Sequence, residues 1–167
     1  MPLIRDGRFT SDDWVRPQEG APLPWYGKLL ITRERLSAEG AALAEAGHLI
    51  GVEIANDTAP ADLEPWLSSL HLIAITFPKP ADGRGFTLAQ RLRRMGYQGE
   101  LRAVGHVIPD QYDLALSCGF DTVEISDALA VRQPEEQWRQ ARSAMSWAYQ
   151  TGGGRQRSIL AARWAAL

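Results

Sequence analysis

The sequence has only one cysteine, Cys118, among its 167 residues. A single thiol cannot form a disulfide within the chain, and it cannot build a zinc or iron–sulfur site from several cysteines. In the segment DLALSCGF it precedes a glycine that can end a helix, where a thiol is usually a small buried apolar group. We therefore predict no metal site and a buried, inert Cys118.

Long uncharged apolar runs are also absent, so no segment suits a membrane-spanning helix. The N-terminal sequence MPLIRDGRFTSDDW is charged by its fifth residue and has no apolar core of secretory length. We expect a cytoplasmic protein without membrane contact. The net charge of −2 gives no general attraction to nucleic acid, so a basic binding site would have to be local.

Common nucleotide-binding and catalytic motifs are missing. No G-x-G-x-x-G follows a strand-like run, and GGGRQRS (152–158) lacks the spacing and the lysine of a phosphate-binding P-loop. The sequence has no G-x-S-x-G and no H-E-x-x-H either. No cofactor is therefore evident, and an oxidoreductase that carries its own cofactor has no positive support.

What the sequence does have is a regular alternation of strand-like and helix-like patterns. Its length and its 45% hydrophobic residues suit one globular α/β domain. Runs that are almost entirely apolar indicate strands buried on both faces of a parallel sheet. The five runs cover residues 29–32, 49–55, 72–77, 101–107 and 122–125. We predict a three-layer, doubly wound sheet of about five strands, flavodoxin-like in order, with a partial (β/α) barrel as the alternative.

The chain divides into three expected regions. Residues 1–26 contain four prolines and suit an arm or a short hairpin. Residues 27–150 carry the alternating pattern of the α/β domain. Residues 151–167 mix apolar residues with arginines, which suggests a tail helix that docks on its own domain or on a second subunit. Homo-oligomer formation therefore stays open.

The segment KPADGRGF (79–86) is the first candidate binding loop, because it follows the third strand-like run. Its glycines allow close backbone approach, and a helix capped by Thr87 would offer free N–H groups. Arg84 adds a fork of donors for carboxylate, sulfate or phosphate. A tight Asp-Gly turn with a solvated arginine is the plainer interpretation.

The loop after the fourth run should lie beside the first loop, because carboxyl ends of parallel strands share one edge of the sheet. It contains His106, a possible general base, although a histidine satisfied by a backbone carbonyl is the more common case. We name these binding candidates: Lys79, Asp82, Gly83, Arg84, Gly85, Arg102, His106, Asp110 and Gln111.

Charged residues also interrupt the apolar runs. If the fourth and fifth strands are neighbours, Arg102 and Glu124 could form a buried pair, and we favour a structural role for it because buried charges need partners. Glu53 is a third case. On the third helical segment, the arginines at 91, 93 and 94 either solvate the helix or dock an acidic partner.

The segment FPKPADGRGFTLAQRLRRMGYQGELRAVGHVIPDQ (77–111), followed by CGFD (118–121), resembles the bacterial family called domain of unknown function 934. The resemblance extends from the LIRDG start to the fifth apolar run. The chain departs from the family pattern at Pro80, at Phe86-Thr87 and at His106, where the family usually has aspartate. That last departure weakens His106 as a base shared by the family.

The resemblance implies a functional context, because genes of that family commonly adjoin those of assimilatory sulfite reductase. It implies an accessory protein of assimilatory sulfite reduction that binds an anion or a partner enzyme, such as sulfite reductase, at the strand carboxyl ends. One alternative is an oxidoreductase using a borrowed flavin or nicotinamide. Another is a structural subunit that assembles through its C-terminal tail. Whether the protein is an enzyme stays open.

Overall fold

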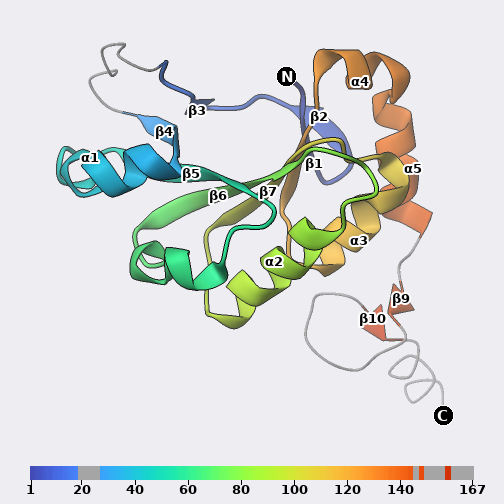
Figure 1. The fold of residues 1–167 in the computed structure, drawn as a ribbon. Helices are drawn as coiled ribbons and strands as arrows, with labels where there is room; N and C mark the ends of the chain where they lie inside the picture. Colours follow the sequence, from blue (N-terminus) through green and yellow to red (C-terminus); the bar gives the residue numbers. More distant parts are fainter. Residues whose placement is uncertain (19–26, 145–146, 149–156, 159–167) are drawn as a thin grey trace.

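The computed structural model describes residues 1–18, 27–144, 147–148 and 157–158 (Figure 1). In this part of the chain, eight strands form one sheet with the order β2-β1-β8-β7-β6-β5-β4-β3. The strands are β1 (Leu3–Arg5), β2 (Arg8–Thr10), β3 (Trp14–Val15), β4 (Lys28–Thr32), β5 (Leu49–Ala55), β6 (Leu70–Phe77), β7 (Glu100–Gly105) and β8 (Thr122–Glu124). Two further short strands, β9 (Trp147–Ala148) and β10 (Arg157–Ser158), pair with each other.

Helices connect the strands (Figure 1). They are α1 (Arg33–Glu45), the 3-10 helix η1 (Pro60–Trp66), α2 (Arg84–Arg94), the 3-10 helix η2 (Pro109–Gln111), α3 (Tyr112–Ser117), α4 (Asp127–Arg132) and α5 (Glu135–Ala144). In the part of the chain that is described, none of them is long and apolar enough to cross a membrane.

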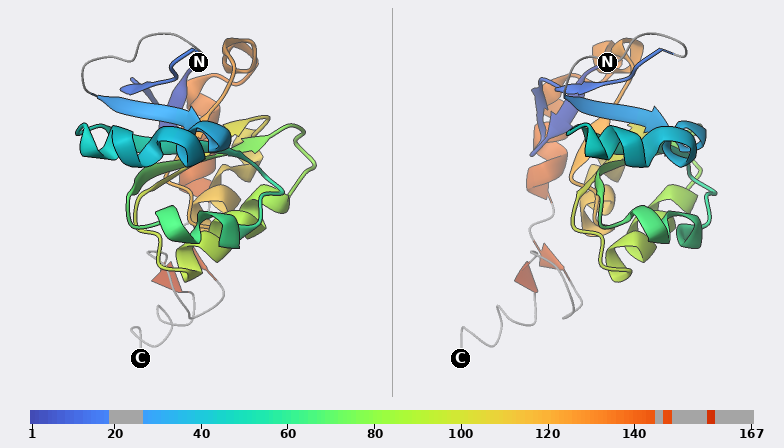
Figure 2. Two further views of the ribbon diagram at one scale, coloured as in Figure 1. Left: turned by 60° about the vertical axis from the view of Figure 1, so that its left-hand side comes forward. Right: turned by 90° about the vertical axis from the view of Figure 1, so that its left-hand side faces the viewer.

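The strand order decides between the two architectures expected from the sequence. Strands β3 to β8 are parallel and keep their chain order across the sheet, with β1 antiparallel at the β8 edge. In a doubly wound sheet the strand order reverses near the middle, so that later strands are added at the opposite edge. The predicted flavodoxin-like order of five strands was therefore wrong. The α/β class is confirmed, and the curled sheet is a half-barrel (Figure 2).

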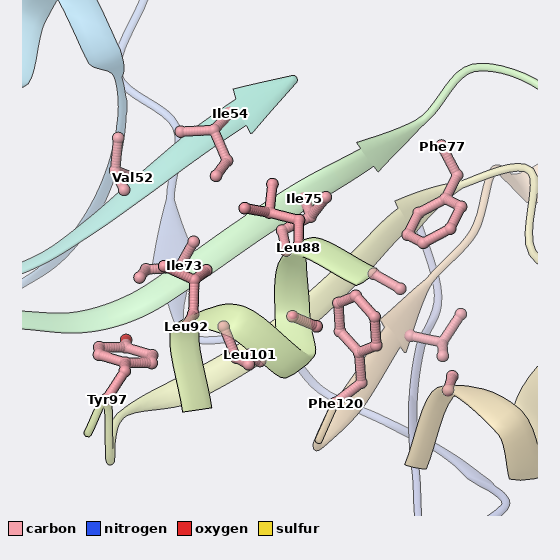
Figure 3. Packing of buried hydrophobic residues seen from close by; sticks show 14 of the residues in the cluster. Val52, Ile54, Ile73, Ile75, Phe77, Leu88, Leu92, Tyr97, Leu101 and Phe120 are labelled. Carbon is pink, nitrogen blue, oxygen red and sulfur yellow. The ribbon is translucent and has the colours of Figure 1, made fainter. Parts of the chain in front are cut away.

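Sequential order also explains where the helices lie. Crossovers between neighbouring parallel strands share one hand, so the connecting helices collect on one face of the sheet. On this outer face, Leu88 and Leu92 of α2 pack beneath Ile73, Ile75 and Leu101 (Figure 3). The main hydrophobic core therefore lies between the sheet and its helices.

The inner face of the half-barrel is covered by the N-terminal arm. Residues 3–10 form the β1–β2 hairpin at one edge of the sheet, whereas β3 lies at the opposite edge. The segment between them therefore crosses the inner face. There Trp14 packs against a small cluster of Leu30, Leu72 and other apolar residues. The tail expected at 151–167 lies outside the described residues, apart from 157–158.

The start of α2 differs from the sequence expectation. The helix begins at Arg84 with Gly83 as its cap, four residues before the predicted cap Thr87. The earlier start buries Phe86, whose ring centroid lies 5.0 Å from that of Phe77 and 6.2 Å from that of Phe120. Burial of an aromatic ring contributes more to stability than a single side-chain cap does. Packing of Phe86 therefore determines where the helix begins.

Cys118 is buried, as predicted. The side-chain amide of Gln90 donates a hydrogen bond to its Sγ at 3.3 Å. Burial raises the pKa of the Cys118 thiol, so the reactive thiolate is disfavoured.

Candidate functional site

The loops after β6 and β7 lie side by side at the carboxyl edge of the sheet, as expected for neighbouring parallel strands. The backbone N–H of His106 donates to the carbonyl of Phe77 at 2.9 Å. The Gln111 side chain donates to the carbonyl of Pro80 at 2.8 Å and accepts from the N–H of Ile108 at 3.3 Å. Gln111 therefore joins the two loops.

Arg84 connects these loops to the loop after β5. Its Nε and Nη2 donate to the two carboxylate oxygens of Asp82 at 2.9 and 2.7 Å, and Nη1 reaches Asp57 at 3.4 Å. We call Asp57, Asp82 and Arg84 the Arg84 clamp. The hydrogen bond to Arg84 holds the pKa of Asp82 well below its usual range, so the pair is fully charged.

The clamp remains open to solvent. The Arg84 side chain is 58% exposed, and each of its terminal nitrogens keeps an N–H that the clamp does not use. Its orientation is nevertheless held by the two-point contact with Asp82. The clamp thus presents a positioned guanidinium at the strand carboxyl ends.

The other candidates in these loops have different surroundings. Lys79, His106 and Asp110 are exposed, and their side chains have no hydrogen-bond or ion-pair partner within the described ranges. Gly83 caps α2. At Gly85 an added Cβ would lie 2.4 Å from the Phe77 ring, so this glycine is required for packing.

Arg102 lies away from the loops, on the inner face of β7. Its side chain has 0% exposure and is surrounded by carboxylates. It donates to Asp12 at 2.6 and 3.0 Å, to Glu124 at 3.0 Å and to Glu100 at 3.1 Å. The predicted pair with Glu124 is therefore confirmed. Burial alone would lower the pKa of Arg102, but its bond to Asp12 and its carboxylate neighbours raise it overall.

A second arginine extends this group of charges. Arg16, from the N-terminal arm, donates to Glu53 at 2.9 Å and to Glu124 at 2.8 Å. We call the resulting set the inner-face network: Asp12, Arg16, Glu53, Glu100, Arg102 and Glu124. The sequence signalled Glu53, Arg102 and Glu124 as charges within apolar runs, but not Glu100, which precedes the run at 101–107. The arm members had no such signal, because they lie outside those runs.

The inner-face network makes stability dependent on pH. Burial raises the pKa of Asp12, but its bonds to Arg102 outweigh this effect, so the pKa is lowered on folding. A lowered carboxyl pKa stabilises the fold fully above the unfolded value of about 3.9, and this contribution disappears as the pH falls further. We expect the unfolding free energy of Asp12→Asn to fall less steeply than that of the wild-type protein as the pH drops below about 4. Denaturant titration at several pH values measures this slope. Equal pH slopes in both proteins would contradict this assignment.

An open cleft of about 660 Å³ lies at the carboxyl ends of β4, β5 and β6. Its charged lining residues are Arg33, Glu34, Glu53, Asp57 and Asp62. Arg33 and Asp62 form an ion pair at 2.8 Å across this lining. The sequence predicted this edge of the sheet but identified neither Arg33 nor Asp62 as a candidate, because their proximity depends on the strand order.

The cleft joins the two charged groups. Glu53 belongs both to its lining and to the inner-face network, whereas Asp57 belongs both to its lining and to the Arg84 clamp. Three of its four carboxylates are paired with an arginine. No group of three metal-ligating side chains occurs within the described residues. The arrangement therefore suits recognition of a polar or charged ligand.

Comparison with curated proteins gives no match. The family described as bacterial protein of unknown function (DUF934) matches residues 51–160. This range contains the Arg84 clamp, α2 and Arg102, whereas Asp12 and Arg16 precede it. The match covers more than half of the chain, and the chain therefore belongs to the DUF934 family of bacterial proteins of unknown function.

Proposed function

We propose that this protein is an accessory binding protein of assimilatory sulfite reduction, which holds its partner enzyme at the carboxyl ends of its parallel strands. The observation that carries the proposal is the Arg84 clamp beside the cleft. It presents an arginine that is oriented by Asp82 yet more than half exposed. The pathway itself is what the family resemblance implies.

The charges at this edge support binding rather than acid–base catalysis. A general base works best with a pKa near the working pH and with a group that orients it. The pKa of Asp82 is instead lowered by Arg84, and the exposed His106 side chain has no orienting partner among the described residues. Paired charges of this kind serve recognition, because they set electrostatic complementarity without a proton transfer.

Between a small anion and a partner protein, the clamp favours the protein. Arg84 is flanked by two carboxylates, so the clamp as a whole carries net negative charge. A free sulfate ion would be repelled by Asp57 and Asp82 at close range. A protein surface can instead offer an acceptor to Arg84 together with donors to the two aspartates.

Binding of sulfite reductase to the Arg84→Ala variant tests this proposal. We expect about tenfold weaker binding than with the wild-type protein, because a central charge-assisted contact is removed. Surface plasmon resonance measures the affinity, and circular dichroism with thermal unfolding checks that the fold is kept. Sulfate titration by calorimetry should show no saturable binding to the wild-type protein.

Arg139→Ala is the matched control for Arg84→Ala. Arg139 is also exposed and also pairs with a nearby carboxylate, that of Glu136, but it lies on α5. This variant should bind sulfite reductase as the wild-type protein does. Unchanged affinity of folded Arg84→Ala, or saturable sulfate binding that competes with the enzyme, would count against the proposal.

A further inference from the structure

We propose that the exposed side of α2 docks a short acidic segment of a partner protein. The surface consists of Thr87, Arg91, Arg94 and Met95, and we call it the α2 arginine face. The inference rests on the proposed function, because α2 begins at the Arg84 clamp and carries this face away from the clamp along the helix. It specifies the chemistry of the partner.

The periodicity of α2 places these residues on one side. Residues three and four apart are neighbours on a helix, so Thr87, Arg91 and Arg94 form one row, with Met95 next to Arg91. All four are exposed. The opposite side, with Leu88 and Leu92, packs beneath the sheet (Figure 3). The helix is thus fixed by its apolar side and offers its basic side to solvent.

Arg93 differs from its neighbours. It donates to the carbonyls of Tyr97, Gly99 and Gly119, and its Nη2 donates to the carboxylate of Asp121 at 2.6 Å. It therefore anchors the end of α2 to the starts of β7 and β8. The sequence predicts a basic surface of three arginines. Because Arg93 is used within the fold, only Arg91 and Arg94 are available for a partner.

Arg91 and Arg94 have no hydrogen-bond or ion-pair partner in the described part of the chain. Residues 83–99 contain no aspartate or glutamate, so nothing on the helix neutralises them. Arg91, Arg93 and Arg94 all lie in the last turn of α2, where the helix dipole favours positive charge. Arg91 and Arg94 are thus a pair of positive charges that no carboxylate neutralises within the described residues.

The surroundings of this face select a short acidic segment over a long polyanion. Carboxylates lie beyond both ends of the helix, at Asp82 and at Asp121. An 11-residue helix is only about 16 Å long, so an extended nucleic acid would reach these carboxylates. Met95 is 39% exposed and offers an apolar contact that a protein side chain can use.

The chain's own C-terminal segment does not have the matching chemistry. Residues 145–167 contain no aspartate and no glutamate side chain, and they include three arginines. Charge complementarity therefore requires a partner from outside this segment.

Fluorescence anisotropy with the full-length protein tests the inference. The probe is a labelled ten-residue peptide of glutamate and leucine, compared with a peptide that has glutamine in place of glutamate. We expect the glutamate peptide to bind with a salt-dependent affinity and the glutamine peptide to bind at least about tenfold more weakly. Arg91→Glu/Arg94→Glu should weaken glutamate-peptide binding by about tenfold or more.

Arg132→Glu/Arg139→Glu is the matched control, because it changes the net charge equally at exposed positions away from α2. It should leave the affinity within about twofold if recognition is local. Equal losses in both double variants would overturn the inference, since binding would then follow net charge alone. Tighter binding of a single-stranded DNA oligomer, or of phosphatidylserine vesicles, would overturn it as well.

The same variants separate this inference from the proposed function. Loss of sulfite reductase binding in Arg84→Ala, with unchanged binding of enzyme and peptide in Arg91→Glu/Arg94→Glu, would overturn only the α2 arginine face. Peptide binding that depends on Arg91 and Arg94, with no sulfite reductase binding by the wild-type protein, would support the face and contradict the proposed partner.

Discussion

Arg102→Met is expected to lower the free energy of unfolding by about 3–5 kcal/mol, the range found when one partner of a buried ion pair is removed. The Arg102 side chain is fully buried and contacts Asp12, Glu100 and Glu124. Methionine keeps most of the volume but leaves these carboxylates without their central cation. Denaturant unfolding followed by circular dichroism measures the change.

A second substitution distinguishes lost charge compensation from lost packing. Combining Arg102→Met with Glu124→Gln removes one of the carboxylates that lost its contact with Arg102. The double variant should therefore lose less unfolding free energy than the two single variants lose together. Arg132→Met, at an exposed position of α4, is the control and should unfold at the wild-type midpoint. A loss below about 1 kcal/mol in Arg102→Met would show that the inner-face network contributes little to stability.

Gly105→Ala is the second prediction with a large expected effect. Gly105 ends β7 with a φ of +111°, and an added Cβ would lie 2.7 Å from the carbonyl oxygen of Phe77. That oxygen accepts the N–H of His106, which holds the two site loops together. Backbone strain and steric overlap together should cost about 3 kcal/mol, measured by denaturant unfolding.

Gly96→Ala serves as the control for Gly105→Ala. Gly96 also has a positive φ, +94°, but an added Cβ would meet nothing within 4 Å. It should therefore show only the cost of the dihedral angle, about 1–2 kcal/mol. The difference between the two variants measures the contact with Phe77. Equal losses would mean that the loops can move apart without cost.

The elements of this fold were largely predictable from local patterns. The five apolar runs correspond to β4–β8, because consecutive apolar residues mark strands that are covered on both faces. The strand order was not predictable in this way. A flavodoxin-like sheet and a half-barrel share the same alternation of strands and helices, and they differ only in the edge to which each new strand is added.

The site shows the same division between local and non-local information. The pairing of Arg102 with Glu124 followed from two charges on adjacent strands. Its completion by Asp12, which is 90 positions away from Arg102, followed only from the path of the arm across the inner face. Likewise, the sequence placed Arg84 beside glycines at a strand end, but not beside Asp57.

The sequence by itself determined the α/β class, the five central strands, the edge of the sheet where the candidate loops meet, and the family. These features depend on residues close together in the chain. Only the tertiary structure decided the strand order of the half-barrel, the path of the arm over the inner face, and which arginines form ion pairs. Ion pairing depends on distances of a few ångströms between segments that are remote in sequence, and the packing of the whole sheet sets those distances.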